Sequence, residues 1–287
     1  MKNISLPERA NKLIQLSIDN HIYAFNHFQW PETLSENEYW FSPDALSIAN
    51  SAVEKELTEE QKIKLSKWEC VNSFSLNNSG ERELIHEVSR VMHELPIGES
   101  KEYLHHLIDE ENQHMWYFNK FCNQYAGKVY TDKKLQLKKE KISKAVDHFL
   151  VFARVLIFEE IGHYYNIMNS KDEKVNQFVR QINKAHYSEE ARHITFGRRL
   201  LEPLAEQALA SEENILKIKN ELNKSIQMNI NALYNPAMYR DAGLEKPMLI
   251  RSRLLEDENR KYIHQNTILK GIKKVFAKLE LDLNVNV

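Results

Sequence analysis

Glycine and proline are scarce in this chain, and their scarcity restricts the fold more than any other feature of the sequence. Only seven glycines and seven prolines occur among 287 residues, against a typical usage of about 7% and 5%. The stretch 128–161 contains neither residue. Sheets and sandwiches need turn residues at short, regular intervals, whereas a helix runs for many turns without them. The sequence therefore predicts an all-α protein built from long helices.

Apolar residues recur with the 3.6-residue period of amphipathic helices along most of the chain. Thr58, followed by Glu59 and Glu60, is a typical helix start. Pro203 is expected to end a long helix, because proline lacks the backbone N–H that continues it. The predicted helices are 7–20, 58–74 with a continuation or a new helix to about 93, 101–125, 134–168, 173–201, 205–232 and 257–280.

The expected architecture is a ferritin-like four-helix bundle core with additional peripheral helices, in one helical domain over residues 1–287. Residues 1–50 are rich in aromatic side chains and are expected to form an ordered arm that wraps the bundle. The four long helices occupy about 55–203. Further helices are expected at about 205–280, interrupted by a loop at 236–247 that contains two prolines and a glycine.

Composition excludes several classes of function. The formal net charge of −2 comes from 39 basic and 41 acidic residues without a basic block, so a nucleic-acid partner is not expected. No apolar run approaches the roughly 20 residues that span a bilayer, and the N-terminus lacks the apolar stretch of a signal peptide. Cys70 and Cys122 are far apart, which excludes a thiolate-built cluster within the chain. These features predict a cytoplasmic protein with no membrane partner.

Charged and imidazole side chains interrupt the apolar stripes of the four long predicted helices. At the fourth helix, three such residues stand at positions i, i+4 and i+7, which lie on one helical face. In the second helix a glutamate and a histidine stand in an E-x-x-H motif, and the first and third helices each contribute a glutamate. The candidate metal ligands, in chain order, are Glu81, Glu111, His114, Glu159, His186, Glu190 and His193.

An ionised carboxylate in a dry core is costly unless it is paired or binds a metal ion. One glutamate from each of two helices, with an E-x-x-H motif from each of the other two, is the ligand set of ferritin-like di-iron and di-manganese bundles. Glu81 precedes Glu111 by 30 residues and Glu159 precedes Glu190 by 31, and each separation suits one helical hairpin. The sequence therefore predicts two metal ions inside the bundle.

A single E-x-x-H match is weak evidence, because the chain contains five of them. The prediction of a dimetal site rests on the two hairpins, whose glutamates have nearly the same separation. Glu160 remains an alternative to Glu159, since it would give a separation of 30 that matches the first hairpin; Glu159 is preferred. His163, one turn later, is a candidate partner of a ligand. No catalytic residue beyond the metal ligands is predicted.

These motifs resemble those of the p-aminobenzoate N-oxygenase (AurF-like) di-iron family. The likeness is most specific at the fourth helix, where His186 stands one turn before the glutamate of the E-x-x-H motif. The resemblance in residue pattern covers roughly residues 40–245. Two departures are Gln113, where family members usually have arginine, and His163, where an acidic residue is common. The stretches that carry the resemblance are LTEEQKIKLSKWECVNSFSLNNSGERELI (57–85), DEENQHM (109–115), FEEIGHYY (158–165), HYSEEARHITFGRR (186–199) and, more weakly, MYRDAGL (238–244).

The resemblance implies a non-haem di-iron monooxygenase with O₂ as co-substrate. Two iron ions, with manganese as the alternative, would be held by four carboxylates and three histidines, and a peroxo-di-iron intermediate would oxygenate the nitrogen of a small-molecule amine of arylamine type. Because the chain lacks a dinucleotide-binding motif and cluster cysteines, the external electron donor would be a separate reductase or ferredoxin. A homodimer is implied by the family alone.

Two other classes of function remain open from the sequence. One is a different dimetal oxidase on the same scaffold, such as a hydroxylase, desaturase or ferroxidase. The other is a non-catalytic helical binding protein whose inward-facing glutamates and histidines are satisfied by hydrogen bonds.

Overall fold

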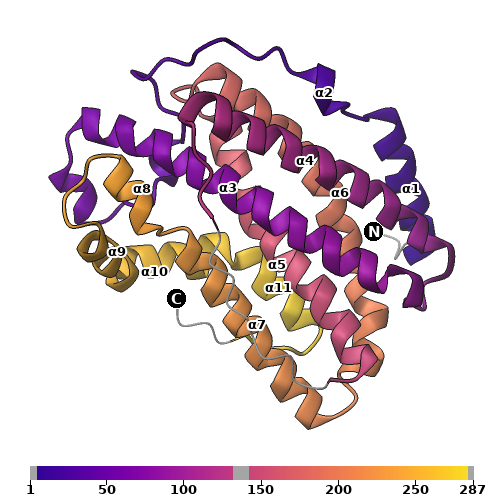
Figure 1. Ribbon diagram of the computed structural model, residues 1–287. Coiled ribbons are helices and arrows are strands. Elements are labelled where there is room, and N and C mark those ends of the chain that lie inside the picture. The colour runs from indigo at the N-terminus through magenta and orange to yellow at the C-terminus, as the bar shows by residue number, and fades with distance from the viewer. Residues whose placement is uncertain (1–4, 132–141, 284–287) are drawn as a thin grey trace.

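The computed structural model describes residues 5–131 and 142–283. Within these ranges the regular secondary structure is helical (Figure 1), apart from one isolated bridge between Tyr39 and Val175. The prediction of an all-α fold is confirmed. Among the helices of the described ranges, none is long and apolar enough to cross a membrane.

Four long helices form the core bundle: α3 (Glu59–Val91), α4 (Glu102–Ala126), α5 (Lys144–Lys171) and α6 (Gln177–Ala208). Helix α3 packs along α4, and α5 packs along α6, so that each hairpin expected from the sequence is present. Contacts of α3 with α5 and of α4 with α6 join the two hairpins. The inward faces of the four helices therefore enclose one common interior.

Local sequence explains where these helices begin and end. Thr58 and Gln61 form a capping box at the start of α3, in which each side chain binds the other residue's backbone N–H. Helix α4 ends at Gly127, whose φ of 60° is the left-handed conformation that glycine adopts most readily. Helix α5 begins after the N-cap Ser143. The predicted start at 134 falls in the stretch 132–141, outside the described residues.

The structure decides one open alternative and corrects one boundary. The predicted helix at 58–74 continues as a single helix, α3, to Val91, and no new helix begins within it. The prediction that Pro203 ends the fourth helix is wrong, since α6 continues through it to Ala208. Proline removes one backbone hydrogen bond, but Leu204 and Ala208 beyond it are buried in the core, and this packing carries the helix through.

The N-terminal segment contains α1 (Leu6–Asp19), which packs against α4 and α6, and the short α2 (Ala24–His27), which packs against α4. Asn169 at the end of α5 accepts a hydrogen bond from the backbone N–H of Ser42, with an N···O distance of 2.8 Å. The segment is thus attached to the bundle at several points along its length, and Figure 1 shows it running along the outside of the long helices.

The C-terminal region contains more and shorter helices than the sequence predicts. Helix α7 (Glu212–Ala232) packs against α5, and α8 (Pro236–Asp241) packs against α3. The expected loop at 236–247 contains α8 and leads into α9, and the expected single helix at 257–280 is divided by a π-helical turn. The elements are α7 (Glu212–Ala232), α8 (Pro236–Asp241), α9 (Pro247–Glu256), α10 (Glu258–Ile263), the π-helical turn (His264–Ile268) and α11 (Lys270–Lys278).

Candidate metal centre

All seven candidate ligands meet inside the core bundle, and each is at most 3% exposed. Helix α3 contributes one of them, α4 two, α5 one and α6 three. Their donor atoms form two sets, within each of which the atoms lie no more than 4.8 Å apart. Glu190 belongs to both sets and lies between them. The first set is Glu81, His114, His186 and Glu190; the second is Glu111, Glu159, Glu190 and His193.

In the first set, His186 faces two carboxylates. Its Nε2 lies 3.3 Å from Glu81 Oε1 and 3.0 Å from Glu190 Oε1. The Nδ1 of His114 lies 3.5 Å from the same oxygen of Glu190 and 4.0 Å from Glu81 Oε1. The histidine one turn before the E-x-x-H glutamate is therefore directed into the centre by its position on α6.

In the second set, His193 holds the equivalent position. Its Nδ1 lies 2.9 Å from Glu111 Oε1, 3.7 Å from Glu190 Oε1 and 3.9 Å from Glu159 Oε1. His114 Nδ1 is 3.3 Å from the other oxygen of Glu111. Glu111 thus lies between His114 and His193, whereas Glu190 lies near all three histidines.

The chemistry of these side chains fits two divalent cations. Four carboxylates carry four negative charges when ionised, which two such ions would balance. Several of their atoms are buried and, although imidazole and carboxylate atoms lie close together, make no well-aligned hydrogen bond with the described residues, a rare and costly condition in a folded protein. These atoms are both side-chain oxygens of Glu81, Glu111 Oε1, Glu159 Oε1, Glu190 Oε2, His186 Nε2 and His193 Nδ1.

Burial and neighbouring charges shift the pKa values of the carboxyl groups in different directions. Burial, together with neighbouring carboxylates, raises the pKa of Glu81 to about 8 and that of Glu159 well above its usual value. Burial acts in the same direction on Glu190, but His186 and His193 outweigh it and hold its pKa well below the usual value. This cluster therefore favours added positive charge strongly.

A second layer of side chains holds the three histidines by their other ring nitrogens. His114 Nε2 lies 3.0 Å from Glu189 Oε2, and His193 Nε2 lies 2.7 Å from Glu110 Oε2. The side-chain amide of Asn166 lies 2.6 Å from His186 Nδ1. A partner of this kind selects the tautomer and the orientation of a metal-binding histidine.

Arg192 connects the two outer carboxylates. Its Nη2 donates to Glu110 Oε1 at 2.8 Å and to Glu189 Oε1 at 3.5 Å, and its Nε donates to Ser17 Oγ at 3.1 Å. This outer layer was not predicted from the sequence. A signal was present in the sequence, because Glu110 directly precedes Glu111 and Glu189 directly precedes Glu190.

The other residues that the sequence singled out do not belong to the two ligand sets. Glu160 is half-buried and accepts a hydrogen bond from Arg198 Nε at 2.7 Å, so it points away from the cluster that contains Glu159. The ring of His163 packs against Tyr187, with ring centroids 6.0 Å apart. Gln113, which replaces the arginine usual at this position, accepts a hydrogen bond from Ala24 N at 2.8 Å and so joins α4 to the N-terminal segment.

Comparison with known families agrees with this geometry. The model of the family described as p-aminobenzoate N-oxygenase AurF matches residues 5–279. The chain belongs to the AurF family. It is accordingly an oxidoreductase that acts with a dimetal centre, as an oxygenase or an oxidase. A comparison with curated proteins finds no match to this sequence.

Solved structures of R2-like ligand-binding oxidases resemble this AurF-family chain in fold. A variant with an anaerobically reconstituted Mn/Fe cofactor is 14% identical, with a TM-score of 0.50 and coverage of 85% of this chain and 92% of that chain. A second structure, with an aerobically reconstituted Mn/Fe cofactor, is 14% identical, with a TM-score of 0.49 and coverage of 86% and 89%. At these identities the likeness concerns the fold alone.

Proposed function

We propose that this AurF-family chain is an O₂-dependent di-iron monooxygenase that oxygenates the nitrogen of a small amine of arylamine type. The observation that carries the proposal is the position of His186, which adds a third imidazole to a four-carboxylate cluster. The match to the p-aminobenzoate N-oxygenase family supports the same reaction class.

The seven side chains of the two sets would hold the metal ions, with Glu190 shared between them. Hard carboxylates and imidazoles suit iron and manganese, and iron is proposed here. Two iron ions supply O₂ activation, which amino-acid side chains cannot perform by themselves. Since the chain carries no dinucleotide-binding motif, we propose that a separate reductase or ferredoxin delivers the electrons.

The chain's own residues shape this centre. Glu110, Glu189 and Asn166 keep the three rings oriented towards the carboxylates. Because every ligand is buried, bulk water is kept from the cluster, which strengthens each electrostatic interaction within it. Orientation, charge and exclusion of water are therefore what the fold contributes.

The test begins with metal analysis of the purified chain after loading with ferrous iron under anaerobic conditions. A chemical reductant, O₂ and p-aminobenzoate as the amine probe are then supplied, and the product is examined by mass spectrometry with ¹⁸O₂. We expect two irons per chain and incorporation of labelled oxygen on the nitrogen. Two irons with O₂ uptake but labelled carbon, or no labelled product with any arylamine tried, would favour another dimetal oxidase.

His186→Ala sharpens this test, with His163→Ala as its matched control. Both remove an imidazole near the centre, but only His186 faces the carboxylates. We expect the first change to lower iron content and abolish N-oxygenation and the second to preserve both. Unchanged iron content and product formation in the His186 variant would refute the proposal.

A further inference from the structure

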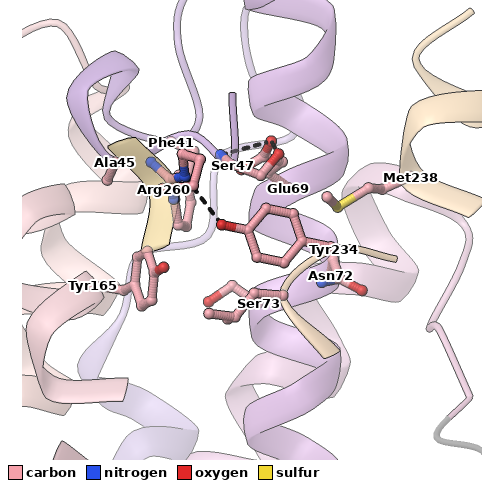
Figure 2. A pocket seen from close by; sticks show the side chains of 11 residues that line it. Phe41, Ala45, Ser47, Glu69, Asn72, Ser73, Tyr165, Tyr234, Met238 and Arg260 are labelled. Atoms are coloured by element: carbon pink, nitrogen blue, oxygen red, sulfur yellow. Dashed lines mark hydrogen bonds between the residues drawn. The ribbon is translucent and has the colours of Figure 1, made fainter. Parts of the chain in front are cut away.

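A second cavity lies outside the metal centre, where the C-terminal helices meet the bundle (Figure 2). Its walls include Ser73 of α3, Tyr165 of α5, Tyr234 after α7 and Arg260 of α10. Its volume is about 20 Å³, which exceeds the roughly 10–15 Å³ that one water molecule needs but does not hold an organic ring. The second cavity therefore suits a water molecule or a single-atom ion.

Arg260 gives this cavity its charge, and that charge is buried without an acidic partner. The side chain is 2% exposed. Its Nε donates to the hydroxyl of Tyr234 at 3.0 Å and its Nη1 donates to the carbonyl oxygen of Ala49 at 3.0 Å. Within the described residues, Nη2 makes no hydrogen bond and no carboxylate forms an ion pair with the guanidinium. A buried charge in this condition is costly, and an anion would relieve it.

Hydroxyl groups supply further donors beside this guanidinium. Tyr165 and Ser73 both line the second cavity, and neither hydroxyl makes a hydrogen bond within the part of the chain that the structure describes. Figure 2 shows them below the hydrogen-bonded pair of Arg260 and Tyr234. One positive charge and two free hydroxyls around an ion-sized space favour an anion over a cation or a neutral molecule.

The carboxyl group on the wall does not neutralise the arginine. Glu69 lines the second cavity, but its oxygens accept hydrogen bonds from the backbone N–H of Ser47 at 2.8 and 3.1 Å and from the Ser47 hydroxyl at 2.5 Å. Burial raises the pKa of Glu69 to about 7. Below that pH the group is therefore largely uncharged, and the positive charge of Arg260 is left unbalanced.

The second cavity is separate from the metal centre along the bundle. Ser73 precedes Glu81 by eight residues of α3, which is about 12 Å of helix. Tyr165 follows Glu159 by six residues of α5, or about 9 Å. An ion beside Arg260 is therefore not a ligand of the metal ions.

We propose that the second cavity is a binding site for one halide ion such as chloride, held by Nη2 of Arg260 and the hydroxyls of Tyr165 and Ser73. Because these residues belong to α10, α5 and α3, the ion stabilises the attachment of the C-terminal helices to the bundle. The site is independent of the reaction proposed for the metal centre, and its occupancy is measured without turnover.

The first test compares thermal unfolding of the metal-loaded protein in sodium chloride and in sodium gluconate at equal ionic strength, since gluconate is too large for the second cavity. We expect chloride to raise the Tm by about 2–4 °C, the shift that a roughly tenfold excess over Kd gives a protein of this size. Equal Tm values in the two salts would show that the cavity holds water instead, and would overturn the proposal.

Variants then locate the effect, because chloride also has access to metal ions. Arg260→Gln should abolish the difference between the two salts. Arg251→Gln should keep it, because Arg251 also donates to backbone carbonyls of this region but does not line the second cavity. A chloride effect that persists in the Arg260 variant would refute the site. If that variant fails to fold, Ser73→Val fills the cavity and leaves the arginine in place; with metal content unchanged, loss of the chloride effect supports the site and its persistence refutes it.

Bromide gives a direct readout that needs no variant. Crystals of the metal-loaded wild type are grown with bromide in place of chloride, at the concentration used for unfolding, and anomalous diffraction is recorded at the bromine edge. We expect an anomalous peak within hydrogen-bond distance of Arg260 Nη2. Density without an anomalous signal in the second cavity, or bromide at the metal ions alone, would overturn the proposal.

Discussion

Two buried glutamates of helix α3 differ in what surrounds their oxygens, and that difference separates a proposed metal ligand from a structural acid. Glu69 and Glu81 are both buried, and burial raises the pKa of the first to about 7 and of the second to about 8. Glu69 accepts hydrogen bonds from Ser47, whereas both oxygens of Glu81 make none with the described residues. Burial and a raised pKa are therefore shared by both residues; what distinguishes the proposed ligand is that its oxygens lack a hydrogen bond and lie among other donor atoms.

Replacing each glutamate by glutamine tests this comparison most directly. Glu81→Gln should lose metal at the set that contains His186, because a neutral amide is a poor ligand and no other carboxylate replaces it. The loss of affinity should exceed the roughly 10- to 100-fold that follows removal of an outer partner. Glu69→Gln should bind metal as the wild type does. Metal titration of both variants measures this, and equal loss in the two would break the distinction.

The pH dependence of stability gives the second test. The pKa of Glu69 is raised in the folded state, so the native protein keeps its proton while the unfolded chain loses it near pH 4.5. The contribution of Glu69 to stability is then greatest below about pH 4.5 and falls as the pH rises to about 7, by about 3 kcal/mol. Urea unfolding of the wild type and Glu69→Gln from pH 4 to 8 measures the difference. A wild-type curve parallel to that of the variant would contradict the assignment.

The smallest expected effect concerns the outer layer of the metal centre. Arg192→Met removes the donor that connects Glu110 and Glu189, so the rings of His193 and His114 lose part of their orientation. We expect metal affinity to fall by about 10- to 100-fold. Arg198→Met is the control on the same helix, because Arg198 pairs with Glu160 away from the cluster. Competition with a chelator measures both, and equal affinities would remove Arg192 from the centre.

Much of the fold could be predicted from local sequence. The long stretches without glycine or proline and the 3.6-residue period predicted the helices, and Thr58 and Gly127 mark real helix ends. Local signals failed where packing overrode them. Pro203 lies inside α6 because the residues beyond it are buried, and the last predicted helix is divided by a π-helical turn at His264, whose Nε2 lies 2.6 Å from the hydroxyl of Tyr234.

The candidate ligands could be named from spacing, because a helix places positions i, i+3, i+4 and i+7 on one face whatever surrounds it. The choice between Glu159 and Glu160 could not, since adjacent residues point only about 100° apart and either could face a core. The packing of α5 against α6 directs Glu159 inwards and leaves Glu160 to Arg198.

The sequence by itself determined that this chain is helical, that two helical hairpins pair, and that carboxylates and imidazoles stand on their inner faces. These features follow from the helical period of the apolar residues and from composition, which depend only on residues near one another along the chain. Only the tertiary structure decided which residues complete the centre and which form the second cavity. Ser17 reaches Arg192, and Ser47 reaches Glu69, across separations of 175 and 22 residues. Contacts of this kind arise from packing, which no local pattern records.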